Sequence, residues 1–146
     1  MTAPGTRPFD GIKVLDFTRF FAGPFGTYQF ALLGADVVKI EPIGGEDNRR
    51  AQLSQEWVDR NMAPAFMSIN ANKRSLTLDL KKPEAQEIVK RLAQDADIVW
   101  ENFRPGVMDR FGLGYETLKA INPKLIYCAV SGFGHSGPES AKAAFD

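Results

Sequence analysis

The chain has 146 residues, the size of one ordinary domain with a real hydrophobic core. Its 18 basic and 18 acidic residues cancel, so no long-range field attracts nucleic acid or an anionic membrane, and any anion site must be local. The single cysteine, Cys128, excludes an internal disulfide and fits a reducing compartment, and we expect it to be a buried strand residue. Residues 1–10 are expected to be a flexible lead without the apolar core of a signal peptide. Because no apolar run is long enough to span a bilayer, we predict a cytoplasmic protein.

The stretch from Gly11 to Glu41 has the pattern of a βαβ unit. An apolar run at 12–17 and another at 36–40 flank a helix-length segment, which is the crossover that parallel strands need. Pro24 suits the first helical position, and Gly34 suits the left-handed position just past the helix end. The three- and four-residue spacing predicts that one helix face packs on the sheet, namely Phe25, Tyr28, Ala31 and Leu32.

The turn between the first strand and this helix is the first candidate binding site. Ligands of open α/β sheets lie beyond the carboxyl ends of the strands, and the small residues Ala22, Gly23 and Gly26 would let a phosphate or an adenine ring approach the backbone. The alternative is that the glycines only pack helix on strand. The turn lacks the GxGxxG fingerprint, which argues against NAD, although Glu41 ends the second strand where such folds often hold a ribose-binding acid.

The middle of the chain offers two cation clusters. Residues 42–66 have no sustained period and read as a long loop over a site or a partner, in which Arg49 and Arg50 either bind a phosphate or are simply solvated. A half-buried strand follows around Leu76, and the segment 72–74, Asn-Lys-Arg, at its entrance could grip a phosphate or form an exposed turn.

The remaining pattern continues the alternation of helices and strands. We predict helices at 82–93, 107–111 and 115–121 and strands at 98–100 and 125–130. Asn102 and Phe103 follow a strand and could bond and stack a planar ring, although Phe103 could equally fill the core. His135, in the loop after the last strand, is either a catalytic residue or an ordinary loop residue. The prediction is an α/β, Rossmann-like, incomplete fold with four or five mostly parallel strands flanked by helices.

Five motifs in order resemble the N-terminal portion of the class III CoA-transferase family, which includes formyl-CoA and carnitine CoA-transferases and the related α-methylacyl-CoA racemases. The motifs are AGP at 22–24, LGADVVKIE at 33–41, NKRSLTLDL at 72–80, ENFRPGVMDRFGLGY at 101–115 and SGFGHSGP at 131–138. The resemblance implies that 11–146 is the N-terminal part of a CoA-binding large domain, and that the full-length protein forms an interlocked homodimer.

The resemblance also implies a set of CoA contacts and no metal. The contact positions are Arg19, Phe21, Ala22, Arg74, Leu78, Asn102, Phe103 and Arg110. CoA carries phosphates that bind arginine and an adenine that packs on apolar and aromatic faces. Pro42 and Ala143 replace basic residues found in some members, so phosphate contacts could move to Lys142.

The catalytic aspartate of the family is expected about thirty residues beyond Asp146, where it would form an acyl anhydride and then a CoA thioester. We therefore expect no catalytic residue in this chain and no activity from it alone, and by register Asp146 is not that nucleophile. Phe145 occupies the position of the racemase histidine, which favours a transferase between an acyl-CoA and a carboxylic acid. An acyl-CoA racemase or isomerase, and a non-catalytic CoA- or nucleotide-binding fragment, remain as alternatives.

Overall fold

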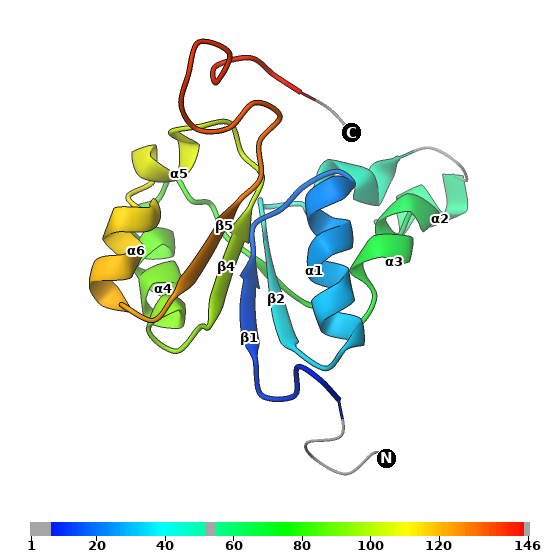
Figure 1. Cartoon of the computed structure of the whole chain (residues 1–146). Helices are drawn as coiled ribbons and strands as arrows, with labels where there is room; N and C mark the ends of the chain where they lie inside the picture. The colour runs from blue at the N-terminus through cyan, green and yellow to red at the C-terminus, as the bar shows by residue number, and fades with distance from the viewer. Residues whose placement is uncertain (1–6, 52–54, 145–146) are drawn as a thin grey trace.

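The computed structural model describes residues 7–51 and 55–144, which form a parallel sheet with helices on both faces (Figure 1). The sheet has the strand order β3-β2-β1-β4-β5, and every neighbouring pair is parallel. Its strands are β1 (Lys13–Asp16), β2 (Asp36–Glu41), β3 (Arg74–Thr77), β4 (Ile98–Glu101) and β5 (Ile126–Ala129). The prediction of an α/β, Rossmann-like fold is confirmed.

The helices form a layer on each side of the sheet. They are α1 (Ala22–Leu32), α2 (Gln55–Asp59), α3 (Pro64–Asn70), α4 (Pro83–Gln94), α5 (Val107–Arg110) and α6 (Tyr115–Ile121), with a 3-10 turn η1 (Asp47–Arg50). In Figure 1, α1 and α3 lie on one side of the strands and α4 and α6 on the other. Because strand side chains alternate, Val14 packs in the core beneath α1, whereas Leu15 packs in the core with Val89 of α4 and Leu118 of α6.

Helix α1 packs on the sheet through small residues, which corrects the predicted face. Of the predicted inward residues only Ala31 is buried, whereas Phe25 is 47% exposed and Leu32 is 50% exposed. The buried side consists of Gly23, Pro24, Thr27 and Ala31. The helix lies so close to the sheet that a Cβ atom on Gly26 would be 2.9 Å from the Trp100 ring. Small side chains therefore fill the contact with the sheet and Phe25 and Leu32 face outward, whereas Phe30 still packs against the core.

The ends of α1 agree with the sequence in part. Gly34 has φ +112°, so the predicted left-handed glycine after the helix is confirmed. Pro24 is the third residue of the helix, not the first, because the helix begins at Ala22. The first described residues also pack on α1, because the Phe9 ring stacks on Phe30 with the centroids 4.7 Å apart.

The described residues of the segment 42–66, which are 42–51 and 55–66, are not a plain loop, contrary to the prediction from their irregular pattern. They contain η1, α2 and the start of α3. Arg49 fastens this segment to the sheet, because its guanidinium contacts the Glu41 carboxylate at 2.6 and 2.7 Å and lies 3.7 Å from the centroid of the Phe66 ring. Tertiary contacts of this kind leave no periodic signal in the sequence.

The prediction of a buried Cys128 is wrong. The residue lies in β5, at the edge of the described sheet, and is only half-buried. An edge strand has a neighbouring strand on one side only, so its side chains are less covered than those of a central strand.

Candidate functional site

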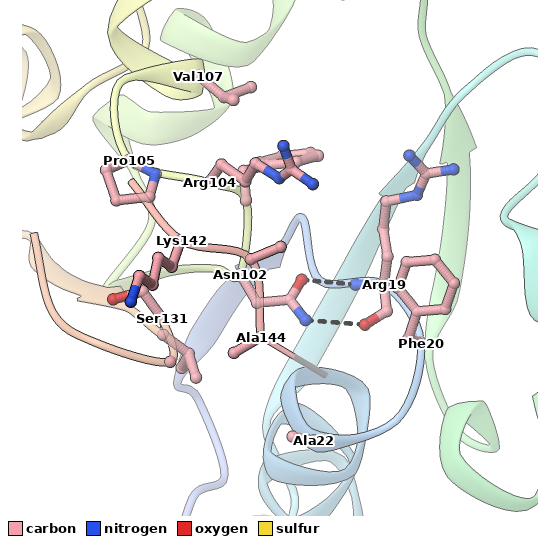
Figure 2. A pocket seen from close by; sticks show the side chains of 14 residues that line it. Arg19, Phe20, Ala22, Asn102, Arg104, Pro105, Val107, Ser131, Lys142 and Ala144 are labelled. Carbon is pink, nitrogen blue, oxygen red and sulfur yellow. Dashed lines mark hydrogen bonds between the residues drawn. The ribbon is translucent and has the colours of Figure 1, made fainter. Parts of the chain in front are cut away.

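A cavity of about 460 Å³ lies where the loops after β1, β4 and β5 meet. From β1 the chain continues into β2 and β3 on one side of β1, whereas β4 and β5 lie on the other side of β1. The strand order therefore reverses next to β1, and open α/β sheets bind ligands at such a switch point. Figure 2 shows the side chains that line it. The lining residues are Arg19, Phe20, Ala22, Asn102, Phe103, Arg104, Pro105, Val107, Val130, Ser131, Gly132, Lys142, Ala143 and Ala144.

The loop after β1 is held by two asparagine side chains. The Arg19 N–H donates to Asn102 Oδ1 at 2.8 Å, and Asn102 Nδ2 donates to the Arg19 carbonyl at 2.8 Å (Figure 2). Asn48 Nδ2 donates to the Phe20 carbonyl at 2.8 Å. Phe20 has φ +64°, a left-handed conformation that costs a non-glycine residue about 1 kcal/mol, so these bonds maintain a backbone that would otherwise relax.

A buried ion pair lies at the carboxyl end of β1. Lys73 Nζ contacts Asp16 Oδ2 at 2.9 Å, and both side chains are essentially inaccessible. The ammonium also donates to Thr27 Oγ1 at 2.8 Å and to the Pro24 carbonyl at 2.9 Å, both in the first turns of α1. Burial lowers the pKa of Lys73 to about 8, against the opposing effect of Asp16. The pair therefore fixes α1 to the end of the sheet.

A second buried pair supports the same loop. Lys39 Nζ donates to the Thr18 carbonyl at 2.7 Å and lies 3.2 Å from Glu46 Oε2. Burial raises the pKa of Glu46, although the nearby Lys39 opposes the shift. These contacts link β2, the loop after β1 and the segment before η1.

The Glu41 carboxylate, which ends β2 where such folds often hold a ribose-binding acid, is fully hydrogen-bonded inside the protein. Its oxygens accept from Arg49, from Ser75 Oγ at 2.7 Å and from the Glu46 N–H at 3.0 Å. Burial alone would raise the pKa of Glu41, but the hydrogen bonds from Arg49 and Ser75 lower it to about 2. Arg49 is therefore neither solvated nor free to bind a phosphate, while Arg50 donates to the Gly44 carbonyl.

The 72–74 segment forms neither a phosphate grip nor a simple exposed turn, because its three side chains diverge. Asn72 Nδ2 donates to the Ala31 carbonyl at the end of α1. Lys73 is buried against Asp16, whereas Arg74 pairs with Asp36 at 2.5 Å on the surface, at the start of β2. The sequence shows two adjacent cations, but strand geometry directs them to opposite faces of the sheet.

The structure brings together four of the eight CoA positions implied by the resemblance. Arg19, Ala22, Asn102 and Phe103 all line the cavity. Phe103 also packs against the core, and stacking on a planar ring stays a prediction. Their two loops are far apart in the sequence but adjacent in space, because β1 and β4 are parallel neighbours.

The other four implied positions are not among the residues that line this cavity. The Phe21 ring stacks on Phe25 on the outer surface, with the centroids 6.0 Å apart. Arg74 is bound to Asp36, and Leu78 packs against the core beyond β3. Arg110 ends the short helix α5. These four residues stay predictions as CoA contacts.

The cavity has cations that residue patterns alone did not single out. Arg104 lines it from the loop after β4, beside Asn102 (Figure 2). Lys142, suggested above as a substitute phosphate contact, also lines it and forms an ion pair with Glu139. Arg104 occurs in a proline- and glycine-containing loop without a periodic pattern, so only its position after a strand signalled a site.

Glu101 is a buried acid directly behind the cavity. Its side chain accepts the Phe103 N–H at 2.7 Å, and the residue is 3% exposed. Burial raises the pKa of Glu101 to about 7, despite that hydrogen bond, and the negative charge of Asp109 adds to the shift. The sequence placed Glu101 at the end of a strand but did not show that it was enclosed.

The remaining single-residue predictions have simple outcomes. His135 is exposed in the loop after β5 and is not among the cavity-lining residues. Phe145 and Asp146 lie outside the described residues. Within 7–51 and 55–144, no group of three or more His, Cys, Asp and Glu side chains could hold a metal ion. In the same ranges no helix combines the length and apolar character needed to cross a membrane.

Comparison with known proteins gives consistent matches over nearly the whole chain. Residues 9–146 match the model of CoA-transferase family III. The chain is 45% identical over 139 residues to a succinyl-CoA–D-citramalate CoA-transferase of Chloroflexus aurantiacus, covering 95% of this chain and 34% of that protein. It is 40% identical over 140 residues to a succinyl-CoA:glutarate CoA-transferase of Mus musculus, covering 96% and 32%.

Solved structures agree with these sequence matches. A CAIB/BAIF family protein from Brucella suis superimposes with a TM-score of 0.88 at 42% identity, covering 96% of this chain and 37% of that chain. Rv3272 from Mycobacterium tuberculosis superimposes with a TM-score of 0.87 at 40% identity, covering 96% and 38%. The chain therefore spans about a third of the length of these relatives.

Proposed function

This chain belongs to CoA-transferase family III, and from that premise we propose that it forms the CoA-binding part of an enzyme that moves CoA between an acyl-CoA and a carboxylic acid. The relatives named above are CoA-transferases of dicarboxylic and hydroxy acids. The family match supports the reaction class, and the cavity supports the role of these residues within it.

The observation that carries the proposal is the composition of the cavity at the switch point. Arg19, Arg104 and Lys142 line it, and two of these cations are paired, Arg19 with Asp47 at 2.8 Å and Lys142 with Glu139. Phe20 and Phe103 supply apolar surface to the same cavity. A ligand with phosphates at one end and a planar base at the other, such as the nucleotide part of CoA, fits this combination.

The chemical step that we propose needs a carboxylate from beyond Asp146. That carboxylate attacks the thioester carbonyl, the C–S bond breaks, and CoA thiolate leaves with the anhydride formed. The thiolate then attacks the enzyme-side carbonyl and releases the donor acid. The acceptor carboxylate attacks the resulting enzyme–CoA thioester, the C–S bond breaks, and CoA thiolate leaves as a second anhydride forms. The thiolate then attacks the acceptor carbonyl of this anhydride, which gives the new acyl-CoA and frees the enzyme carboxylate. In this scheme the described residues bind and orient CoA, and the 146-residue chain alone has no transferase activity.

We also propose that the full-length protein is a homodimer. Large apolar side chains on the outer face of α1 support this, since Phe21, Phe25 and Leu32 are each about half exposed. Contiguous exposed apolar surface is typical of an interface. Light scattering of the full-length protein would measure the state directly, and a monomer would contradict the proposal.

Calorimetric titration of the chain with CoA tests the binding role. Arg104→Ala removes one cavity cation and should weaken CoA binding about five- to thirtyfold, because a charge-assisted contact contributes about 1–2 kcal/mol. Arg60→Ala is the matched control, since Arg60 is exposed and pairs with Glu56 on α2. Wild-type protein that does not bind CoA, or equal losses in both variants, would refute the role of the cavity.

The reaction class needs the full-length protein. We expect CoA transfer from an acyl-CoA to an added carboxylic acid, measured by chromatography of the CoA esters. Incubation in deuterated water separates the alternative, because a racemase exchanges the substrate α-hydrogen. Exchange without CoA transfer would overturn the transferase proposal in favour of a racemase or isomerase.

A further inference from the structure

The oxygen and the nitrogen of the Asn102 side-chain amide both form hydrogen bonds with the backbone of one residue, Arg19. Its Oδ1 accepts the Arg19 N–H and its Nδ2 donates to the Arg19 carbonyl, each at 2.8 Å. Figure 2 shows these two bonds side by side at the cavity wall. A primary amide paired in this way reproduces the two hydrogen bonds that a residue exchanges with a neighbouring strand.

The position of this pair explains why a side chain is needed. The Phe17 N–H donates to the Trp100 carbonyl at 2.8 Å, which continues the β1–β4 ladder just past the end of β1. Two residues further along each segment, Arg19 pairs with the Asn102 side chain instead of its main chain. The backbones have separated there, and the asparagine amide spans the gap that forms the cavity.

Helix α1 confines the amide from the other side. A Cβ atom on Gly23 would lie 3.1 Å from Asn102 Cγ and 2.6 Å from Thr18 Cβ. Only glycine allows the first turn of α1 to approach the loop this closely. The amide is therefore held between the helix and the loop that it bonds.

The next residue shows what the pair controls. Phe20 follows Arg19 with its left-handed backbone, and both residues line the cavity. We propose that Asn102 is a positioning residue, whose amide holds the Arg19–Phe20 wall in its ligand-binding shape. This differs from the direct CoA contact that the family resemblance implies for Asn102, and it rests on the proposed function for the identity of the ligand.

The first test measures hydrogen exchange at the Arg19–Phe20 wall in the absence of ligand. In the ¹⁵N-labelled 146-residue chain, the Arg19 amide should be protected from hydrogen exchange, and Asn102→Ala should remove that protection. The matched control is Asn122→Ala, because Asn122 Nδ2 also makes two bonds, at 3.0 Å to the Ala93 carbonyl and at 2.8 Å to the Ala96 carbonyl. It is not a cavity-lining residue, so Arg19 protection should be unchanged.

In Asn102→Asp, protonation of the new carboxyl group should restore the protection of the Arg19 amide, a result that only the two-bond pairing predicts. A carboxylate has no donor for the Arg19 carbonyl and places a second acceptor oxygen against it, so the repulsion between the two oxygens should open the pair and lower the Arg19 protection at neutral pH. A protonated carboxyl group has one donor and one acceptor, as the amide does, so protection should return at about pH 4 and below. Protection factors corrected for intrinsic exchange should show no such return in Asn102→Ala.

Titration with CoA completes the experiment. We expect Asn102→Ala to raise the Kd for CoA about tenfold, because it lowers the population of molecules whose Arg19–Phe20 wall has the ligand-binding shape. Asn122→Ala should leave the Kd unchanged. A raised Kd with Arg19 protection intact would overturn the inference and make Asn102 a direct contact. If wild-type protein does not bind CoA but Arg19 protection follows the pattern above, the positioning role stands and the proposed function fails.

Discussion

At the scale of single residues, the Lys73–Asp16 pair is the contact whose loss should matter most. Lys73→Met leaves the Asp16 carboxylate buried without its cation, which we expect to cost about 3–5 kcal/mol of unfolding free energy. Urea denaturation followed by circular dichroism measures this loss. Asp16 would keep the hydroxyl groups of Thr18 and Thr27 and the Thr18 backbone N–H as hydrogen-bond donors.

The neighbouring residue supplies the control for this prediction. Arg74→Ala removes an ion pair whose side chains are 68% and 46% exposed, and such surface pairs contribute at most about 1 kcal/mol. The double variant Asp16→Asn with Lys73→Met should be more stable than Lys73→Met alone, because it contains no unpaired buried charge. Equal losses at Lys73 and Arg74 would contradict the buried position of the ammonium.

At the scale of elements, the contact between α1 and the sheet depends on the absence of a side chain at Gly26. Gly26→Ala would place its Cβ 2.9 Å from the Trp100 ring, so the helix or the indole must move. The gain in helix propensity is about 1 kcal/mol, and overpacking costs about 1–3 kcal/mol, so we expect lower stability overall.

The measurements for this variant are thermal unfolding and tryptophan fluorescence. Gln29→Ala, on the same helix but without a described side-chain contact to Trp100, should change neither the melting temperature nor the emission appreciably. A stabilised Gly26→Ala protein with unchanged emission would mean that α1 lies further from the sheet than the structure shows.

The elements differ in how far the sequence predicts them, for physical reasons. Helix α4 was predicted closely, because its apolar residues repeat on one face and Ala85, Val89 and Ala93 are indeed buried. Helix α1 was predicted as a helix but with the wrong face, since large apolar residues normally face a core. Its packing distance is set by the glycines and by Thr27, whose hydroxyl binds Asp16, and apolar periodicity does not record either feature.

At the scale of the whole molecule, the location of the candidate site was predictable from the sequence, whereas the hydrogen bonds and ion pairs around it were not. Because carboxyl ends of parallel strands share one edge of a sheet, the loops holding Arg19 and Asn102 were expected to meet, and they do. Lys73 was expected either to bind a phosphate or to lie in an exposed turn, and the structure shows it buried against Asp16. The direction of a side chain in a strand depends on register, and a one-residue shift reverses it.

The pH dependence of stability is a property of the whole chain that tests the enclosure of Glu101. Its folded pKa of about 7 lies above its ordinary value of 4.5, so the folded state binds the proton more tightly than the unfolded state. The resulting stabilisation is fully present below pH 4.5 and is lost as the pH rises through 7, by at most about 3 kcal/mol.

Other shifted groups do not obscure this pH window. Glu41, with a folded pKa of about 2, adds stability above pH 4.5 and loses it only as the pH falls towards 2. Lys73, with a folded pKa of about 8 and an unfolded value of 10.5, is charged in both states below pH 7. Glu46, whose pKa is also raised, is present in both of the proteins to be compared.

The comparison is therefore between wild type and Glu101→Gln at about pH 5 and about pH 7.5, by urea denaturation. Wild-type stability should fall by up to about 3 kcal/mol more than that of the glutamine variant, whose amide keeps an acceptor for the Phe103 N–H and does not titrate. Identical pH slopes in the two proteins would show that the pKa of Glu101 is not raised, and that water reaches its carboxyl group.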